Sequence, residues 1–295
     1  MLSRISQVVQ TPRLGVADCN SDAELIDLWL HDKTPNTVDA YRRDAEEFRW
    51  FVEDKPLYRV VLNDLMLYCD ALTQQGRAPA TVNRKLSAVK SLLSYGVMIG
   101  YLPLNAGAAF KLPKLDDSLA ERILCESQVL RLIDAANPGR DRTLLRFLYE
   151  SGCRVSELIA LTWRNLQPRD DAGQVRILGK GNKTRVVLLT PQLWSALMAL
   201  RGKAPLNEPV FRSLHSGQKL NRSDINDLVT RVAKKAGIQV NVSPHWLRHA
   251  HASHSLERGA PIHLVQATLG HSNLQTTGRY LHARPTDSSA RYLPR

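Results

Sequence analysis

His245 and Arg248 lie three residues apart in the segment Ser243-Pro-His-Trp-Leu-Arg-His249, which combines an imidazole with a guanidinium. Ser243 is a favourable helix N-cap and Pro244 suits a first helical position, so we expect a helix that carries both side chains on one face. Near a helix N-terminus a guanidinium binds phosphate oxygens and an imidazole moves protons. The segment therefore indicates phosphate chemistry, although a pair of ordinary surface residues has the same spacing.

A second histidine, His271, lies between two helix-end patterns. Gly270 before it is typical of a helix C-cap, and Ser272 after it begins the pattern of a capping box. We therefore expect His271 in a tight corner between two helices. Tyr280 lies in the second of these helices, after three residues that lower helix stability. A histidine that serves only the turn, and a tyrosine that serves only packing, are the alternative interpretation.

Arg154 lies where one expected helix ends and the next begins, and Glu157 follows it by one helical turn. In such a pair the arginine can bind an anionic ligand while the glutamate orients it. A salt bridge at the helix terminus explains the same spacing.

Lys180 belongs to the turn Gly-Lys-Gly-Asn-Lys between two β-rich runs, 174–178 and 184–189. The pattern predicts a β-hairpin with a short loop. The glycines would let the lysine move toward a ligand or away from it. The alternative is an ordinary basic turn on the surface.

In chain order, these segments resemble the motifs of the tyrosine recombinase (phage integrase) family: Gly-x-Arg-x-Ser-Glu-Leu, a lysine on a β-hairpin, His-x-Leu-Arg-His, Leu-Gly-His and a late tyrosine. The matching residues are Arg154, Lys180, His245, Arg248, His271 and Tyr280. Segments 36–41 and 81–87 resemble the core-binding helices of the family, and Asn105 resembles the usual end of that domain. The resemblance is to compact, Xer-like recombinases with two domains.

The resemblance implies a site-specific recombinase that cleaves and rejoins DNA through a 3′-phosphotyrosine intermediate and a Holliday junction, with no metal, ATP or other cofactor. A phenol titrates near ~10, so at neutral pH it needs a base or a positive field to attack. The implied roles are nucleophile for Tyr280, base for His245, phosphate clamp for Arg154 and Arg248, hydrogen-bond donor for His271, general acid for Lys180 and support for Glu157.

The fold class expected is mainly α with a small β-hairpin or sheet, in two domains. Apolar residues recur at helical spacing along 20–108, which predicts an all-helical core-binding domain after an N-terminal tail, 1–19. The aperiodic stretch 109–122 predicts a linker, and a mixed α+β catalytic domain is expected over 123–295. By the resemblance, the two domains form a C-shaped clamp on DNA.

The net charge of +12 indicates an anionic partner, most simply nucleic acid. Residues 20–110 contain 10 basic and 12 acidic residues, whereas 123–295 contain 25 and 12, so the second domain carries the attracting field. A helix near 79–95 is expected to enter a DNA groove. The candidate DNA contacts are Arg42, Arg43, Arg84, Lys85, Lys90, Lys183 and Arg185.

The expected partners are a double-stranded recombination site and a homotetramer on synapsed DNA, with a related recombinase as a second option and no membrane. No run approaches the ~18 apolar residues of a membrane span, and the N-terminus lacks an apolar signal core. The four cysteines form no Cys-x-x-Cys pair, which favours a reduced, cytoplasmic location.

Three other functions fit parts of the sequence. A metal hydrolase would use the clustered histidines, but the glutamate of His-Glu-x-x-His and an acidic magnesium cluster are missing. Those histidines are His245, His249, His251 and His254. A type IB topoisomerase shares the six-residue chemistry but not the core-binding motifs. An inactive DNA-binding accessory protein would usually have lost one of the six residues.

Overall fold

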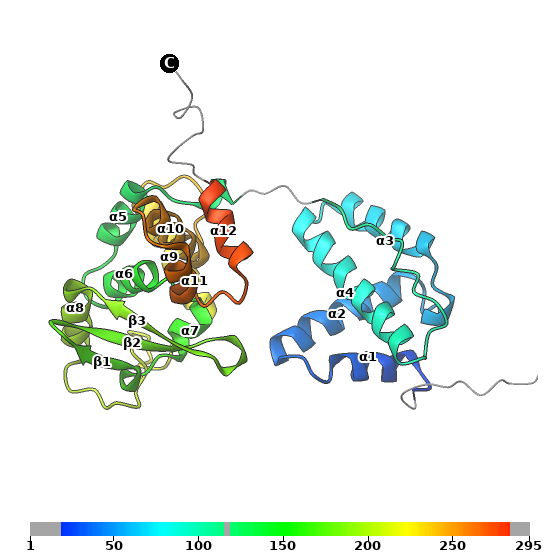
Figure 1. Cartoon of the computed structure of the whole chain (residues 1–295), viewed down its shortest axis with the longest axis horizontal. Helices are drawn as coiled ribbons and strands as arrows, with labels where there is room; N and C mark the ends of the chain where they lie inside the picture. The colour runs from blue at the N-terminus through cyan, green and yellow to red at the C-terminus, as the bar shows by residue number, and fades with distance from the viewer. Residues whose placement is uncertain (1–18, 115–118, 284–295) are drawn as a thin grey trace, which may run out of the picture. The chain divides into compact units, whose positions relative to one another are not determined.

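The computed structural model describes residues 19–114 and 119–283. The chain forms two compact units, Met1–Asp116 and Asp117–Arg295 (Figure 1). Their boundary falls inside the stretch 109–122 that was expected to link two domains. The described part is mainly helical with one small antiparallel sheet, which confirms the predicted fold class. None of the helices in these ranges is long and apolar enough to cross a membrane.

The described part of the first unit is a set of α-helices around one apolar core. Helices α2 and α4 pack against each other, and α1 packs on both. Trp29 stacks on Tyr41 with ring centroids 5.2 Å apart, and Phe48 and Leu86 are fully buried between the helices. The helices are α1 (Asp22–Leu30), α2 (Pro35–Phe51), α3 (Leu62–Gln74) and α4 (Pro79–Met98), with a short 3-10 turn at Leu57–Arg59.

The helix starts of this unit follow from local sequence. The Ser21 hydroxyl accepts a hydrogen bond from the Glu24 amide at 3.2 Å and caps α1. Pro35 and Pro79 occupy the first positions of α2 and α4, where the missing N–H costs nothing.

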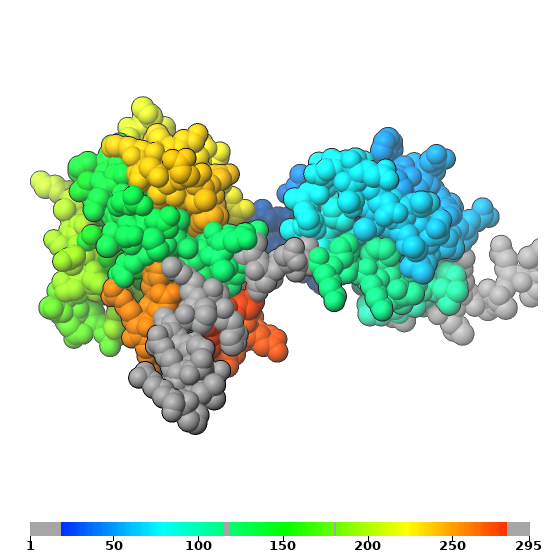
Figure 2. Space-filling view, turned by 90° about the horizontal axis from the view of Figure 1, so that it is seen from above, coloured from blue at the N-terminus to red at the C-terminus, as the bar shows by residue number. Residues whose placement is uncertain are grey.

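The second unit surrounds a three-stranded sheet with helices. Its helices are α5 (Glu126–Ala135), α6 (Arg140–Ser151), α7 (Val155–Ala160), α8 (Pro191–Arg201), α9 (Arg222–Lys235), α10 (Pro244–Glu257), α11 (Ile262–Leu269) and α12 (Leu274–Ala283). Short 3-10 turns lie at Ala120–Arg122, Trp163–Asn165 and Lys180–Asn182. Helix α10 packs against α6, α11 and α12, and α11 packs against α12 (Figure 1). The space-filling view shows α9, in yellow, against α5, in green (Figure 2).

The sheet has the order β1-β2-β3 and is antiparallel throughout. The predicted hairpin is β2 (Ala172–Leu178) with β3 (Thr184–Leu189), and Leu178 pairs with Thr184 at its turn end. Strand β1 (Leu166–Arg169) was not predicted, because four residues that include Pro168 carry almost no strand signal. A proline is tolerated there because β1 is an edge strand.

Gly152 allows α6 and α10 to approach each other at the end of α6. Its φ is +58°, in the left-handed region, where glycine is favoured. A Cβ at this position would lie 2.8 Å from Leu269 Cδ2 and 2.9 Å from His251 Cδ2. The glycine that opens the Gly-x-Arg motif is therefore required by packing as well as by backbone conformation.

Gly152→Ala should lower the free energy of unfolding by about 3 kcal/mol, because it combines backbone strain with overpacking. Urea unfolding of the whole chain measures the change. Gly237→Ala is the matched control, since Gly237 has a φ of +71° but open space around its Cα, so only about 1 kcal/mol should be lost. Equal losses in the two variants would contradict the close approach.

Candidate active site

Arg248 is the most deeply buried of the predicted site residues, with 1% of its surface exposed. Its Nη1 donates to the Gly152 carbonyl at 2.5 Å and its Nη2 donates to the Leu269 carbonyl at 2.7 Å. Burial, followed by the charge of Arg154, lowers the pKa of Arg248 to about 10, so the group stays cationic at neutral pH. A guanidinium has five N–H donors, and these two carbonyls accept from two of its nitrogens.

Glu157 is the buried carboxylate that binds two arginines. Arg154 donates to it from its backbone N at 2.8 Å and from Nη1 at 2.9 Å. Arg185 donates from Nη1 at 3.0 Å and from Nη2 at 2.7 Å, and its Nε donates to the Thr268 carbonyl at 2.6 Å. Burial alone would raise the pKa of Glu157, but these hydrogen bonds and charges outweigh it and hold the pKa below its ordinary value.

Arg154 borders two hollows in the surface of the second unit. One, of about 730 Å³, is also lined by the hairpin turn and by His271. The other, of about 390 Å³, is lined by Arg222, Ser243 and His245 as well. The half-buried Arg154 side chain therefore lies at the edge of both hollows.

His271 lies in the corner between α11 and α12, as its flanking residues predicted. Its Nδ1 is 2.9 Å from the hydroxyl of Thr277, which is fully buried. Burial, followed by the charges of Arg248 and Arg154, lowers the pKa of His271 to about 4. The cap of α12 differs from the prediction: the Asn273 side chain, in place of Ser272, accepts a hydrogen bond from an amide of the first turn, that of Gln275, at 2.8 Å.

Tyr280 lies on α12 with 6% of its surface exposed, within a small apolar cluster that includes Val265 and Leu269. Its hydroxyl is 2.8 Å from Nδ1 of His249. Burial raises the pKa of Tyr280, while the positive charges of Arg248, Arg279 and Arg154 act in the opposite direction. The phenol is thus protonated at neutral pH but lies in a cationic field.

His249 is the site residue that the sequence reasoning missed. Its ring packs edge-on against that of His245, with an interplanar angle of 64° and centroids 4.2 Å apart. Burial, followed by the charges of His245 and Arg248, lowers its pKa to about 3. The available signal was its place one helical turn after His245 in the same motif, where it was considered only as a metal ligand.

His245 begins the face of α10 that points at the site and lines the smaller hollow. Desolvation, together with the charges of Arg248 and Arg154, lowers its pKa, so the imidazole is neutral at neutral pH. The Tyr280 hydroxyl hydrogen-bonds with Nδ1 of His249, although His245 was expected to serve as the base for that hydroxyl.

Lys180 lies in the 3-10 turn Lys180–Asn182 between β2 and β3. Gly181 and Asn182 in this turn have φ values of +73° and +61°. The turn lines the larger hollow through Gly179, Gly181 and Lys183. The backbone therefore brings the predicted lysine to the rim of the hollow; its side chain lies outside the described atoms.

The candidate DNA contacts of the first unit differ in how far their side chains are buried or paired with acids. Lys85 is only 7% exposed and forms ion pairs with Asp44 and Glu47, so in this structure it does not face solvent. Arg84 also pairs with Asp44. Arg42 pairs with Asp27. Lys90 donates to the Phe110 carbonyl, and Arg43 is exposed.

The two candidates of the hairpin also differ. Lys183 is exposed at the rim of the larger hollow. Arg185 has an 11% exposed side chain, and Glu157 and Thr268 occupy all three of its guanidinium nitrogens. Charge type alone predicted a phosphate contact for Arg185, but the structure uses it to fasten β3 to α7 and to the end of α11.

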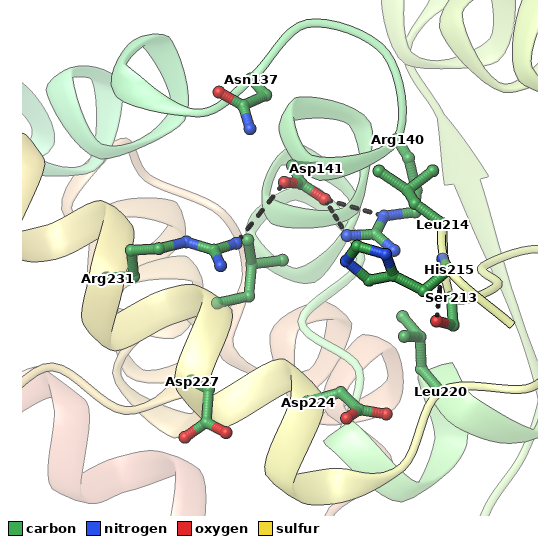
Figure 3. A pocket seen from close by; sticks show the side chains of 11 residues that line it. Asn137, Arg140, Asp141, Ser213, Leu214, His215, Leu220, Asp224, Asp227 and Arg231 are labelled. Carbon is green, nitrogen blue, oxygen red and sulfur yellow. Dashed lines mark hydrogen bonds and ion pairs between the residues drawn. The ribbon is translucent and has the colours of Figure 1, made fainter.

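A separate hollow of about 340 Å³ lies between α6 and α9 (Figure 3). The buried Asp141 carboxylate within it accepts a hydrogen bond from Arg140 Nε at 2.8 Å and lies 3.9 Å from Arg231 Nη2. Its lining contains both signs of charge and none of the six predicted catalytic residues.

The four histidines of the metal-site alternative lie among different partners. His251 Nδ1 is 2.8 Å from the Tyr149 carbonyl, and His254 Nε2 is 3.0 Å from the Leu124 carbonyl. His245 and His249 face the site. Across residues 19–114 and 119–283, no three His, Cys, Asp or Glu side chains are grouped as metal ligands.

The arrangement suits the transfer of a phosphoryl group. Arginines supply fixed positive charge where a pentacoordinate phosphate would gain negative charge, and neutral histidines can donate or accept hydrogen bonds there. The phenol of Tyr280 is a nucleophile that lies in the field of these arginines and hydrogen-bonds with one of these histidines.

Comparison with known proteins identifies the same two parts of the chain. The Phage integrase family model matches residues 122–287, and the model "Phage integrase, N-terminal SAM-like domain" matches residues 25–98. Tyrosine recombinase XerD of Staphylococcus aureus is 32% identical over 262 residues, which cover 84% of this chain and 88% of the relative. Tyrosine recombinase XerD of Shewanella oneidensis is 35% identical over 277 residues, covering 88% and 91%.

Solved structures show the same fold. A lambda integrase tetramer bound to a Holliday junction superimposes with a TM-score of 0.73 at 17% identity, over 92% of this chain and 80% of that one.

Glu157→Gln should lower the free energy of unfolding at pH 7 by about 2 kcal/mol, because it weakens hydrogen bonds from two charged groups. The folded-state pKa of Glu157 is lowered, so the wild-type advantage is complete above the ordinary value of 4.5 and is lost as the pH falls through the folded-state pKa. Urea unfolding of both proteins at pH 7 and at pH 3.5 should show that the difference between their free energies of unfolding becomes smaller at the lower pH.

Glu126→Gln is the control for Glu157→Gln, because Glu126 is 45% exposed and pairs with Arg258 at the surface. Its loss should be below about 1 kcal/mol. If Glu157→Gln lowers the free energy of unfolding equally at both pH values, the shape of the side chain, and not its charge, accounts for the stability that Glu157 contributes.

Proposed function

Because the chain belongs to the phage integrase family, and is thus a site-specific recombinase that cleaves and rejoins DNA, we propose that Tyr280 attacks a DNA phosphate held by Arg154 and Arg248. One observation carries the assignment. The tyrosine that the family motif predicts lies buried in the field of both arginines, although it is 126 and 32 residues away from them in sequence.

The proposed first step is a transesterification. Tyr280 Oη forms a bond to phosphorus, the bond from phosphorus to the 5′ oxygen breaks, and the strand is left with a 3′-phosphotyrosyl end and a 5′-hydroxyl. The phenol proton passes to His245, whose neutral imidazole can accept it, and Lys180 protonates the departing oxygen. The second step is the reverse reaction with a 5′-hydroxyl from the same or a partner duplex. No cofactor is invoked, because the free energy of the broken phosphodiester bond is kept in the phosphotyrosyl ester and is available for rejoining the strand.

The groups around the phosphate, Arg154, Arg248 and His271, are called the cage here. The cage would act mainly by electrostatics. Charge on the non-bridging oxygens grows as the fifth bond forms, and fixed donors lower the free energy of that state without reorganising. Glu157 supports this role because it fixes Arg154 at two nitrogens while leaving the hollows on either side open. His271, fixed by Thr277, would supply a further donor.

For DNA binding, we propose that exposed basic residues at the rims of the two hollows contact the backbone of a duplex. Lys183 and Arg222 occupy such positions. Lys85 and Arg185 are not proposed as contacts, because their charges are occupied inside the protein. In the first unit Arg43 and Arg84 are the exposed candidates, and Arg84 is paired with Asp44.

A tetramer on synapsed DNA is proposed for the active assembly. The support is the fold shared with lambda integrase, which has been solved as a tetramer on a Holliday junction. A cytoplasmic location is proposed as well, because the substrate is DNA.

Tyr280→Phe should abolish the covalent protein–DNA product while duplex binding persists. The duplex is first selected from a random-sequence pool by retention on the Tyr280→Phe protein. Wild-type protein is then incubated with it, and the adduct is counted as label that stays with the protein in detergent. An undiminished yield in Tyr280→Phe would remove Tyr280 from the role of nucleophile.

Lys183→Gln should weaken binding of that duplex and reduce the slope of log affinity against log salt by about 0.9, the value for one phosphate contact. Lys203→Gln is the control, because Lys203 is exposed but lines neither hollow. A slope that changes equally in both variants would contradict a local contact at the hairpin.

A further inference from the structure

The hydroxyl of Tyr280 already has a defined partner before DNA arrives. Nδ1 of His249 lies 2.8 Å from it, within the range of a strong hydrogen bond. The two rings are tilted by 47° with centroids 5.7 Å apart, so the contact is made by the polar atoms and not by stacked faces. The position of the nucleophilic oxygen is therefore tied to α10.

His249 is fixed by its neighbours. It follows Arg248, whose guanidinium is bound to the carbonyls of Gly152 and Leu269, and its ring stands edge-on to His245. The oxygen of Tyr280 is consequently positioned by the same helix that positions one of the proposed phosphate clamps.

The charge state of His249 decides what it can do. Burial and the neighbouring charges of His245 and Arg248 lower its pKa to about 3, so the ring is neutral and resists taking up a proton. A neutral imidazole carries one N–H. The phenol loses its proton during attack, and only a donor keeps its hydrogen bond to the oxygen as the negative charge develops. We therefore assign the N–H to Nδ1.

Building on the function proposed above, we propose that His249 donates its Nδ1–H to the Tyr280 oxygen, positions it for attack and stabilises the phenolate while His245 receives the proton. The bond changes are those of the first step described above, and His249 neither gains nor loses a proton in it. The proposal separates two tasks that the sequence had assigned to one histidine.

Three variants at position 249 test the proposal through the rate of covalent adduct formation on the selected duplex. His249→Leu removes the donor and should slow cleavage by about 10²-fold, the usual cost of one such donor. His249→Asn places an amide N–H near the position of Nδ1 and should stay within about tenfold of wild type. His249→Gln places its amide near the position of Nε2 and should be as slow as the leucine variant. A slow asparagine variant, or a leucine variant as fast as wild type, would overturn the proposal.

A ligation assay separates positioning of the nucleophile from general damage to the cage. A strand with a 3′-nitrophenyl phosphate end can be joined to a 5′-hydroxyl without Tyr280, so Tyr280→Phe should perform this step. His249→Leu should perform it too, at a rate within about threefold of wild type. A ligation defect as large as the cleavage defect would overturn the proposal, because a structural role predicts loss of both steps.

A spectroscopic measurement on the DNA-free protein tests the direction of the hydrogen bond. The chain is labelled with 3-fluorotyrosine, and the ¹⁹F resonance that is missing in Tyr280→Phe is followed during alkaline titration. Its pKa should rise in His249→Leu and return toward wild type in His249→Asn. A pKa that falls or stays constant in His249→Leu would overturn the assignment of the donor.

These outcomes are distinct from a failure of the proposed function. If wild type and Tyr280→Phe give equal adduct, the proposed nucleophile is wrong whatever the variants at position 249 do. If Tyr280→Phe alone loses the adduct, the proposed function stands and only the role of His249 is rejected.

Discussion

The burial of the Arg248 guanidinium is the constraint on which the rest of the site depends. A buried cation must exchange water for other hydrogen-bond acceptors, and here they are the last carbonyls of two helices, at Gly152 and Leu269. These carbonyls have no partner within their own helices. One side chain thus satisfies two helix ends and joins α6 and α11 to α10.

The single carboxylate among these cations has a matching role. Glu157 binds Arg154 and Arg185 together, so it offsets part of the positive charge that the site accumulates and still leaves Arg154 at the rim of both hollows. Through Arg185 it also connects the β-hairpin to the corner that carries His271. The positive charge that remains acts on the histidines together with burial: burial, followed by Arg248 and Arg154, lowers the pKa of His271 to about 4, and burial, followed by His245 and Arg248, lowers the pKa of His249 to about 3.

Most of the fold could be predicted from the sequence because helical periodicity, capping residues and a glycine turn are local signals. Strand β1 could not, because its pairing is decided by β2 and its four residues carry no alternation. The motifs from which Arg154, Arg248, His271 and Tyr280 were predicted reflect helix ends, which are local signals. Lys85 and Arg185 were predicted as DNA contacts from charge alone, and a charge reveals nothing about burial: in the structure each is paired with an acid distant in sequence. His249 was missed because its partner comes from another helix, 31 residues away.

Helix α12 contributes two contacts to the site from one short segment. Thr277 holds His271 and, one turn later, Tyr280 meets His249. Since both side chains move with the same backbone, any displacement of the helix that withdraws the phenol also releases the imidazole. The two contacts are therefore made or lost together, and the histidine corner and the phenol behave as one mechanical part.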